Sequence, residues 1–245
     1  MGRLILDNIT VRYGERVVLE GVTLSFHIPG FIAIVGPNGA GKSTLAKVIT
    51  QTIPFEGDVR SEDVSHTLKV GYVWQNPDLN FISSRVWEEV IISLLLAGND
   101  RETAEEKAEV LLKEFGLWRF RQSDINSLSG GYKQVLAIIT MVSMDPDVII
   151  FDEVTSMLDV KERYIVLGYL YQLSRRMLIF LITQREEELK YVSRVIGIAG
   201  GKVVYDGDNT SLWDGKYQKL GLSVPKTYML TKKWGLPWKP LGMLG

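Results

Sequence analysis

A glycine-rich segment between an apolar run and a helical segment constrains the fold of this chain more than any other part of the sequence. Residues 31–35 read FIAIV between two glycines and predict a fully buried strand. Residues 36–43 then read GPNGAGKS, which fits the pattern G-x-x-x-x-G-K-S/T, and residues 45–50 predict a helix. A strand, a glycine-rich loop and a helix in this order indicate an α/β fold with a phosphate-binding loop.

The residue types in this loop suit the binding of ATP. Glycines allow successive backbone N–H groups to turn toward phosphate oxygens, and the helix that follows adds the positive end of its dipole. Lys42 is expected to reach the β- and γ-phosphates, and the Ser43 hydroxyl to ligate Mg²⁺. A glycine-rich turn without a ligand is the alternative, which the flanking strand and helix disfavour. The predicted nucleotide contacts in the loop are Gly36, Pro37, Asn38, Gly39, Ala40, Gly41, Lys42, Ser43 and Thr44.

Two further apolar runs, at residues 148–151 and 177–182, predict strands of the same buried kind, and residues 69–74 predict another strand. They alternate with helical segments, so we expect a mainly parallel sheet that is covered by helices on both faces. Residues 86–115 have a helical period and predict a mainly helical insert that ends near Ser127.

Antiparallel pairs are predicted near both ends of the chain. Apolar and polar residues alternate between residues 4 and 19, which predicts short antiparallel strands. Residues 195–199 and 202–205 flank two glycines and predict a hairpin.

Two acidic residues, Asp152 and Glu153, follow the apolar run at residues 148–151. The end of a buried strand beside a phosphate loop is where a second contact to Mg²⁺ is expected, which assigns Asp152 to the metal. Glu153 would polarise the attacking water as a general base. The alternative is that both carboxylates only cap the next helix, and the phosphate loop makes that alternative weaker.

Composition excludes several classes of function. The chain of 245 residues has no cysteine and two histidines, so disulfides, Cys-ligated zinc and thiol catalysis are excluded. A net charge of −1 gives no basic excess for binding nucleic acid. The longest apolar run, residues 90–97, is shorter than the roughly 20 residues that span a bilayer, and the chain does not start like a signal peptide. We expect a cytoplasmic protein whose membrane role depends on partners.

Residues 128–134 read LSGGYKQ and resemble the LSGGQ signature of ABC ATPases. Other motifs of that family follow in the same order. Tyr13 stands where the family stacks an aromatic ring on adenine, and Gln75 stands where the Q-loop glutamine is found. Residues 156–159, which end in Asp159, resemble the D-loop. The resemblance implies a RecA-like core with a mainly parallel sheet, an N-terminal antiparallel β-subdomain and a helical insert that carries the signature.

The resemblance also implies a division of the chain. Residues 1–207 would form the ABC ATPase domain, with a helical subdomain at about residues 76–144, and residues 208–245 would form an extension. The composition of this extension predicts an irregular tail that packs on its own core or on a second subunit. Its tryptophans and prolines are Trp213, Trp234, Trp238, Pro225, Pro237 and Pro240.

The signature opens a predicted helix at residues 132–144, where exposed N–H groups, a hydroxyl and the helix dipole form a second anion site. In the family this site closes on the γ-phosphate held by the opposing subunit. The resemblance therefore implies a head-to-tail dimer that encloses two ATP molecules. It also gives Gln75 a place at Mg²⁺ and in catalysis. The signature residues are Leu128, Ser129, Gly130 and Gly131.

One branch of the family has similar local sequences. Residues 75–78 (QNPD), 86–90 (VWEEV) and 152–159 (DEVTSMLD) resemble energy-coupling-factor importers and their cobalt-transport relatives. Those importers take up vitamins or metal ions. They pair two ATPases with a membrane coupling subunit and a substrate-binding membrane subunit, which would hold this chain on the inner face of the cell membrane. Apolar residues would receive a coupling helix there, or belong to the core of the insert: Leu79, Phe81, Ile82, Val86 and Trp87.

Three positions depart from the family pattern. Gln184 stands where the family has the switch histidine, Val154 replaces the usual small residue or proline, and Tyr132 replaces the glutamine after LSGG. Glutamine can donate a hydrogen bond to phosphate but cannot be protonated, so we expect slower hydrolysis at this loop. The partner would then be a different ATPase with its own histidine, although a homodimer stays open.

Three other functions remain as alternatives. Hydrolysis at this site could be impaired, so that the chain serves as an ATP-binding module of a heterodimeric motor. An exporter is disfavoured because exporter ATPases are often fused to their membrane domain. Soluble ABC proteins of chromosome maintenance or translation are disfavoured because the insert is short and the chain carries one ATPase domain.

Overall fold

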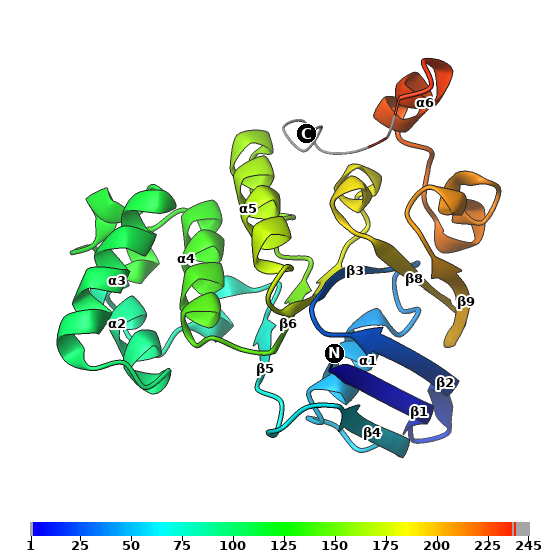
Figure 1. The fold of residues 1–245 in the computed structure, drawn as a ribbon, viewed down its shortest axis with the longest axis horizontal. Coiled ribbons are helices and arrows are strands. Elements are labelled where there is room, and N and C mark those ends of the chain that lie inside the picture. The colour runs from blue at the N-terminus through cyan, green and yellow to red at the C-terminus, as the bar shows by residue number, and fades with distance from the viewer. Residues whose placement is uncertain (1, 237, 239–245) are drawn as a thin grey trace.

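Two sheets carry the fold (Figure 1). The computed structural model describes residues 2–236 and residue 238. The larger sheet has six strands in the order β5-β6-β7-β3-β8-β9, of which β9 runs antiparallel to β8 and the others pair in parallel. Its strands are β3 (Gly30–Val35), β5 (Val70–Val73), β6 (Val148–Asp152), β7 (Leu178–Ile182), β8 (Arg194–Ala199) and β9 (Lys202–Gly207). The predicted mainly parallel sheet is confirmed.

The smaller sheet is antiparallel and has the order β2-β1-β4. Its strands β1 (Arg3–Tyr13) and β2 (Arg16–His27) have 11 and 12 residues, so the prediction of short strands was wrong. Sequence analysis also missed β4 (Glu56–Glu62), which is almost entirely polar. Its pairing with β1 is supported by ion pairs across the sheet, from Arg60 to Asp7 at 3.3 Å and from Arg3 to Glu62 at 2.7 Å. Hydrophobic patterning gives no signal for such a strand.

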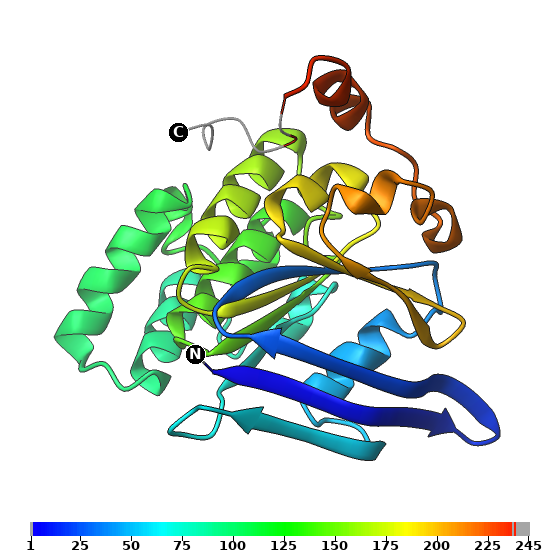
Figure 2. The same cartoon turned by 45° about the vertical axis from the view of Figure 1, so that its right-hand side comes forward.

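Helices cover both faces of the larger sheet (Figure 2). Helix α1 (Lys42–Ile49) packs between the two sheets in one hydrophobic cluster. The second cluster lies on the opposite face, beneath α4 (Gly130–Ser143) and α5 (Val160–Leu173). Strand β3 contributes alternate residues to the two clusters, which explains why the whole strand is apolar.

The insert between β5 and β6 is mainly helical, as predicted. Helices α2 (Val86–Leu96), α3 (Arg101–Glu114) and α4 lie together at the end of the molecule opposite the smaller sheet (Figure 1). A short 3-10 turn, η1 (Pro77–Asn80), precedes α2, and two others, η2 (Trp118–Phe120) and η3 (Ile125–Ser127), lie between α3 and α4. The predicted helical stretch at residues 86–115 is interrupted at residues 97–100, where Asp100 caps α3 by accepting from the Thr103 N–H at 2.8 Å.

The segment after β9 is more regular than its composition predicted. It contains η5 (Ser211–Trp213), η6 (Tyr217–Leu220) and α6 (Lys226–Lys233). Trp213 is 5% exposed and meets Tyr228 and Trp238 with ring centroids 5.9 and 5.7 Å apart. Pro237 and Pro240, which also entered the prediction, lie outside the described residues. The division at residue 207 stays a prediction.

Among residues 2–236 and 238, every helix is too short or too polar to cross a bilayer.

Candidate active site

The loop between β3 and α1 follows a path that requires glycine at two positions. Gly36 has φ 149° and Gly41 has φ 108°. A Cβ atom on Gly36 would lie 2.0 Å from the Ile198 carbonyl oxygen, and one on Gly41 would lie 2.7 Å from the Leu19 side chain. The loop therefore packs directly against neighbouring backbone and core, which leaves no room for a side chain at these two positions.

Lys42 folds back into this loop. Its side chain is 6% exposed, and Nζ donates hydrogen bonds to the carbonyl oxygens of Gly36 at 2.8 Å and Pro37 at 3.0 Å. Burial lowers the pKa of Lys42 from its usual value, and the nearby charges of Glu153 and Asp152 oppose that shift. The ammonium group is thus bonded to the loop and lies within the electrostatic influence of the two acidic residues, and its contact with phosphate stays a prediction.

Asp152 ends β6, and its carboxylate is held by a residue that sequence analysis missed. The Tyr72 hydroxyl on β5 donates to Asp152 Oδ2 at 2.6 Å. Burial and this carboxylate raise the pKa of Tyr72 well above its usual value, so the phenol remains a donor. Tyr72 lies inside an apolar run, where a tyrosine suggests packing and not a polar contact.

Glu153 has an unusual backbone and a well-defined side chain. Its φ is 51°, in the left-handed region, and its N–H donates to the Ile182 carbonyl at 3.0 Å. One carboxylate oxygen accepts from Gln184 Nε2 at 2.9 Å, and the other accepts from Gln75 Nε2 at 3.2 Å. Three residues predicted to act in catalysis, from separate segments of the chain, therefore meet at one carboxylate.

Gln184 also reaches the phosphate loop. Its Nε2 donates to Asn38 Oδ1 at 2.6 Å as well as to Glu153. Both amide hydrogens of Gln184 are thus used, and they connect the end of β7 to the loop after β3. The neighbouring Val154, which departs from the family pattern, is fully buried in the core next to Glu153.

These side chains surround a cavity of about 520 Å³. Tyr13 does not line it; this residue is 51% exposed at the end of β1, and it pairs across the hairpin with Arg16, which does line it. Arg16 and Val18 were missed by sequence analysis because nothing in β2 marks them. The lining residues are Arg16, Val18, Asn38, Gly39, Gly41, Lys42, Ser43, Thr44, Gln75, Asp152, Glu153 and Gln184.

The signature lies outside this cavity. Ser129 caps α4 by accepting from the Tyr132 N–H at 3.4 Å, so the helix begins at Gly130 and not at residue 132 as predicted. A Cβ on Gly131 would lie 2.9 Å from Glu162, which shares a capping box with Asp159 at the start of α5. Leu128 is 8% exposed. The signature and the D-loop thus pack on each other, and neither closes this chain's own phosphate loop.

Tyr132, the third departure from the family pattern, faces the insert. Its ring packs against Phe120 with centroids 4.8 Å apart, and its hydroxyl accepts from Arg119 at 2.5 Å. The side chain is therefore occupied by contacts within the helical insert, while the backbone of the signature is unaffected.

The chemistry of the available donors fits Mg²⁺. Ser43 offers a hydroxyl, Asp152 a carboxylate and Gln75 an amide oxygen, because the amide nitrogen of Gln75 is used in the bond to Glu153. The described residues contain no group of three or more His, Cys, Asp or Glu side chains that could hold a metal. Mg²⁺ is commonly bound by one or two carboxylates together with substrate phosphates. The site suits a cation that arrives with a nucleotide.

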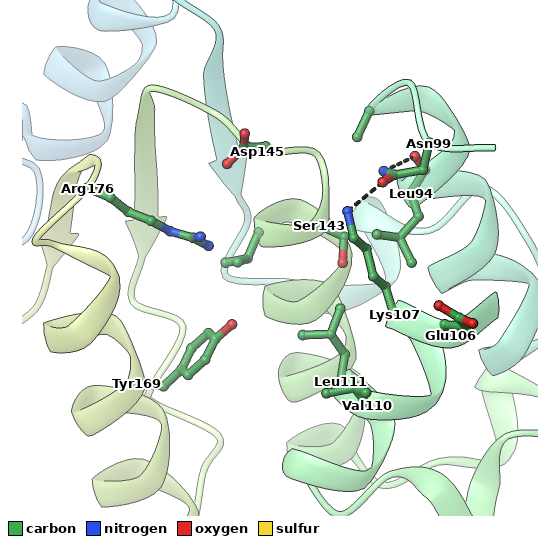
Figure 3. A pocket seen from close by; sticks show the side chains of 12 residues that line it. Leu94, Asn99, Glu106, Lys107, Val110, Leu111, Ser143, Asp145, Tyr169 and Arg176 are labelled. Carbon is green, nitrogen blue, oxygen red and sulfur yellow. Dashed lines mark hydrogen bonds between the residues drawn. The ribbon is translucent and has the colours of Figure 1, made fainter. Parts of the chain in front are cut away.

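A second cavity, of about 570 Å³, lies between the helical insert and α5 (Figure 3). Lys107 and Asn99 line it, and Lys107 Nζ donates to Asn99 Oδ1 at 2.6 Å. Tyr169 of α5 and Arg176, which follows that helix, lie across from them. The lining includes no predicted site residue, so this cavity is separate from the candidate active site.

The apolar residues predicted to receive a coupling helix divide into two groups. Leu79 and Ile82 are 66% and 73% exposed. Val86 is fully buried in the core of the insert, and Trp87 packs edge-on against Trp118 at 6.0 Å. Val86 therefore belongs to the core, which was the alternative interpretation.

Comparisons with known proteins agree with this geometry. The ABC transporter family matches residues 19–156. The energy-coupling factor transporter ATP-binding protein EcfA1 of Bacillus subtilis is 32% identical over 93% of this chain and 86% of its own length. The solved structure of cbiO1 from Clostridium perfringens, part of the ABC transporter complex cbiONQ, superposes with a TM-score of 0.75 at 22% identity, covering 94% of this chain and 98% of that one.

A third relative was solved as a dimer. The ATP-binding cassette MJ0796, in a post-hydrolysis state with ADP and phosphate, has a TM-score of 0.74 at 26% identity and covers 84% of this chain and 98% of that one. The phosphate loop, the paired acidic residues and the signature thus occur within a fold shared with ATP-binding cassettes. This chain belongs to the ABC transporter family and is one of its ATP-hydrolysing subunits.

Proposed function

We propose that this chain is the ATPase subunit of an energy-coupling-factor importer, which takes up a vitamin or a metal ion through membrane partner subunits. ATP would bind at residues 36–44 with Mg²⁺, and a second ATPase subunit would complete the site. The observation that carries the hydrolytic part of this proposal is the Glu153 carboxylate, which is held between Gln75 and Gln184 beside the loop that contains Lys42.

The residues of the cavity support a division of work during hydrolysis. Lys42 would exchange its two loop carbonyls for phosphate oxygens, which relieves the burial of its charge. Glu153 would accept a proton from the attacking water. Gln184 would give up one of its bonds to Asn38 and Glu153 and donate that amide hydrogen to the γ-phosphate. When bound at Asp152, Ser43 and Gln75, Mg²⁺ would supply positive charge that offsets the charge developing on the phosphates.

The importer branch is supported by the relatives and by the surface of the insert. The name of the Bacillus subtilis relative describes an energy-coupling factor transporter, and the Clostridium perfringens relative is part of a multi-subunit ABC transporter. Leu79 and Ile82, in the segment that follows Gln75, offer exposed apolar side chains for a membrane subunit. In this proposal the chain is cytoplasmic and lies on the inner face of the cell membrane.

The partner subunits can be tested directly. A tagged copy of the chain is purified from detergent-solubilised membranes of its own host, and the co-purified subunits are identified and assayed for ATP hydrolysis. The proposal expects a second ABC ATPase and two different membrane proteins. A complex with a single fused exporter chain, or recovery of the tagged chain without any membrane protein, would contradict it.

Gln184 favours a second candidate function. A glutamine at this position cannot carry a positive charge toward the γ-phosphate, so this site could act mainly as an ATP-dependent dimerising module while the partner's site hydrolyses. Phosphate release measured for each site separately decides between the two functions. Release at the partner's site alone favours the module, and release at both sites favours an active ATPase.

A further inference from the structure

The tyrosine that contacts Asp152 is placed with little freedom. Tyr72 lies on β5, beside β6, and the parallel register sets it against Ile150, two residues before Asp152. Residues two apart on a strand share a face, so the Tyr72 ring points along β6 toward its carboxyl end. The residue is 9% exposed, and its ring packs against Trp74 with centroids 4.3 Å apart.

The contact itself is a strong one. The hydroxyl donates to Asp152 Oδ2 at 2.6 Å, within the range of hydrogen bonds from a hydroxyl to a charged carboxylate. Within the described part of the chain, the Asp152 side chain accepts this one hydrogen bond. The second oxygen, Oδ1, remains for another partner. Lys42 lies near enough for the charge of Asp152 to act on it.

We propose that Tyr72 is a positioning residue for Mg²⁺: by holding Oδ2 of Asp152 it fixes the orientation of the carboxylate that would bind the cation arriving with ATP. The proposal rests on the Mg²⁺ site of the proposed function. It adds to this site a residue of β5, which lies on the face of the sheet that α1 covers.

The physical reason lies in the geometry that Mg²⁺ demands. The cation requires near-octahedral coordination at short distances, so a carboxylate held in one orientation binds it better than one that rotates. If the phenol hydroxyl is removed, the Asp152 side chain can rotate, and it can turn toward the Lys42 ammonium instead. Both changes weaken binding of the cation without altering the loop that binds ATP.

The test measures how Mg²⁺ changes ATP affinity, with no hydrolysis required. The Tyr72→Phe variant removes one oxygen atom and keeps the ring. Binding of a fluorescent ATP analogue is titrated at increasing Mg²⁺ and in EDTA. We expect the affinity for the ATP analogue in EDTA to be unchanged. The Mg²⁺ concentration that gives half of the maximal increase in this affinity should rise about tenfold. Tyr205→Phe is the matched control, because its hydroxyl donates to the Asp208 carbonyl away from the cavity, and it should behave as wild type.

Two results of this titration would overturn the proposal, and they differ in whether the Mg²⁺ site itself fails as well. If wild-type ATP binding does not respond to Mg²⁺, the Mg²⁺ site of the proposed function fails together with the role of Tyr72. If wild type responds and Tyr72→Phe has the same Mg²⁺ requirement, the role of Tyr72 alone fails.

A double variant separates positioning from folding. In an Asp152→Asn background, Tyr72→Phe should cause no further change in the Mg²⁺ requirement, because the carboxylate that the phenol positions is absent. An additive loss in the double variant would show that Tyr72 acts on the fold and not through Asp152. The melting temperature of each variant is measured alongside.

Discussion

The catalytic assignment depends on one carboxylate. Glu153 stands in the left-handed region with φ 51° and is fixed by amides from two other segments. A non-glycine residue in this region is held there by its surroundings, and such positions are frequent at functional sites. The backbone and the side chain of Glu153 are thus both held by neighbouring groups of the chain.

Replacement of Glu153 by glutamine should abolish hydrolysis at this site while ATP-driven dimerisation persists. The amide keeps the size of the side chain but cannot accept a proton from water. Phosphate release and dimer mass are measured on the same sample. Glu106→Gln is the control, because this exposed carboxylate borders the second cavity and does not line the candidate active site. Unchanged phosphate release in Glu153→Gln would refute the assignment of the base.

Gln184→His should raise the turnover at this site. An imidazole can be protonated and can place a positive charge near the γ-phosphate, which the amide cannot do. Turnover of the variant and of wild type is compared under conditions where both dimerise, with Gln184→Ala as a variant that should be slower than either. Equal rates for histidine and glutamine would show that the departure from the family pattern does not limit hydrolysis.

At the scale of elements, the start of the helical insert places an exposed residue and a buried residue only four positions apart in the sequence. Ile82 is 73% exposed, whereas Val86, the first residue of α2, is fully buried. Both are β-branched aliphatic residues in a segment of similar composition. The sequence pattern did not distinguish them, because which side of α2 faces α4 depends on how the helices pack.

The two residues provide a matched pair of substitutions. Val86→Ala should lower the free energy of unfolding by about 2 kcal/mol, because a buried aliphatic side chain is truncated. Ile82→Ala should change it by less than about 0.5 kcal/mol and should reduce recovery of the membrane subunits. Denaturant unfolding and co-purification measure the two effects. Loss of membrane partners with Val86→Ala but not with Ile82→Ala would place the contact elsewhere.

The parts of the fold that sequence predicted are those with an apolar or glycine signal. Strands β3, β6 and β7 are buried on both faces, and the phosphate loop has glycines whose Cβ atoms would collide with the core. Strand β4 was missed because ion pairs and pairing with β1 hold it. Arg16 and Tyr72 were missed as site residues because their contacts arise only when distant strands meet.

At the scale of the whole molecule, we expect the phosphate loop to form half of an ATP site that a second subunit completes. The signature residues pack on the D-loop of the same chain and do not line its cavity. A subunit placed head to tail would bring its own signature to this loop. The ATP-binding cassette MJ0796, which has a similar fold, was solved as a dimer with bound ADP and phosphate.

The most direct measurement of this claim is ATP-dependent cross-linking between the two motifs. The chain has no cysteine, so cysteines introduced at Asn38 and Ser129 are the only thiols available to a short bifunctional maleimide. In the Glu153→Gln background, ATP should produce an intermolecular product, either between two copies or between Ser129→Cys and the matching loop position of the second ATPase. If ATP produces no cross-linked product either between two copies of this chain or between this chain and the second ATPase, the phosphate loop does not form half of a shared site.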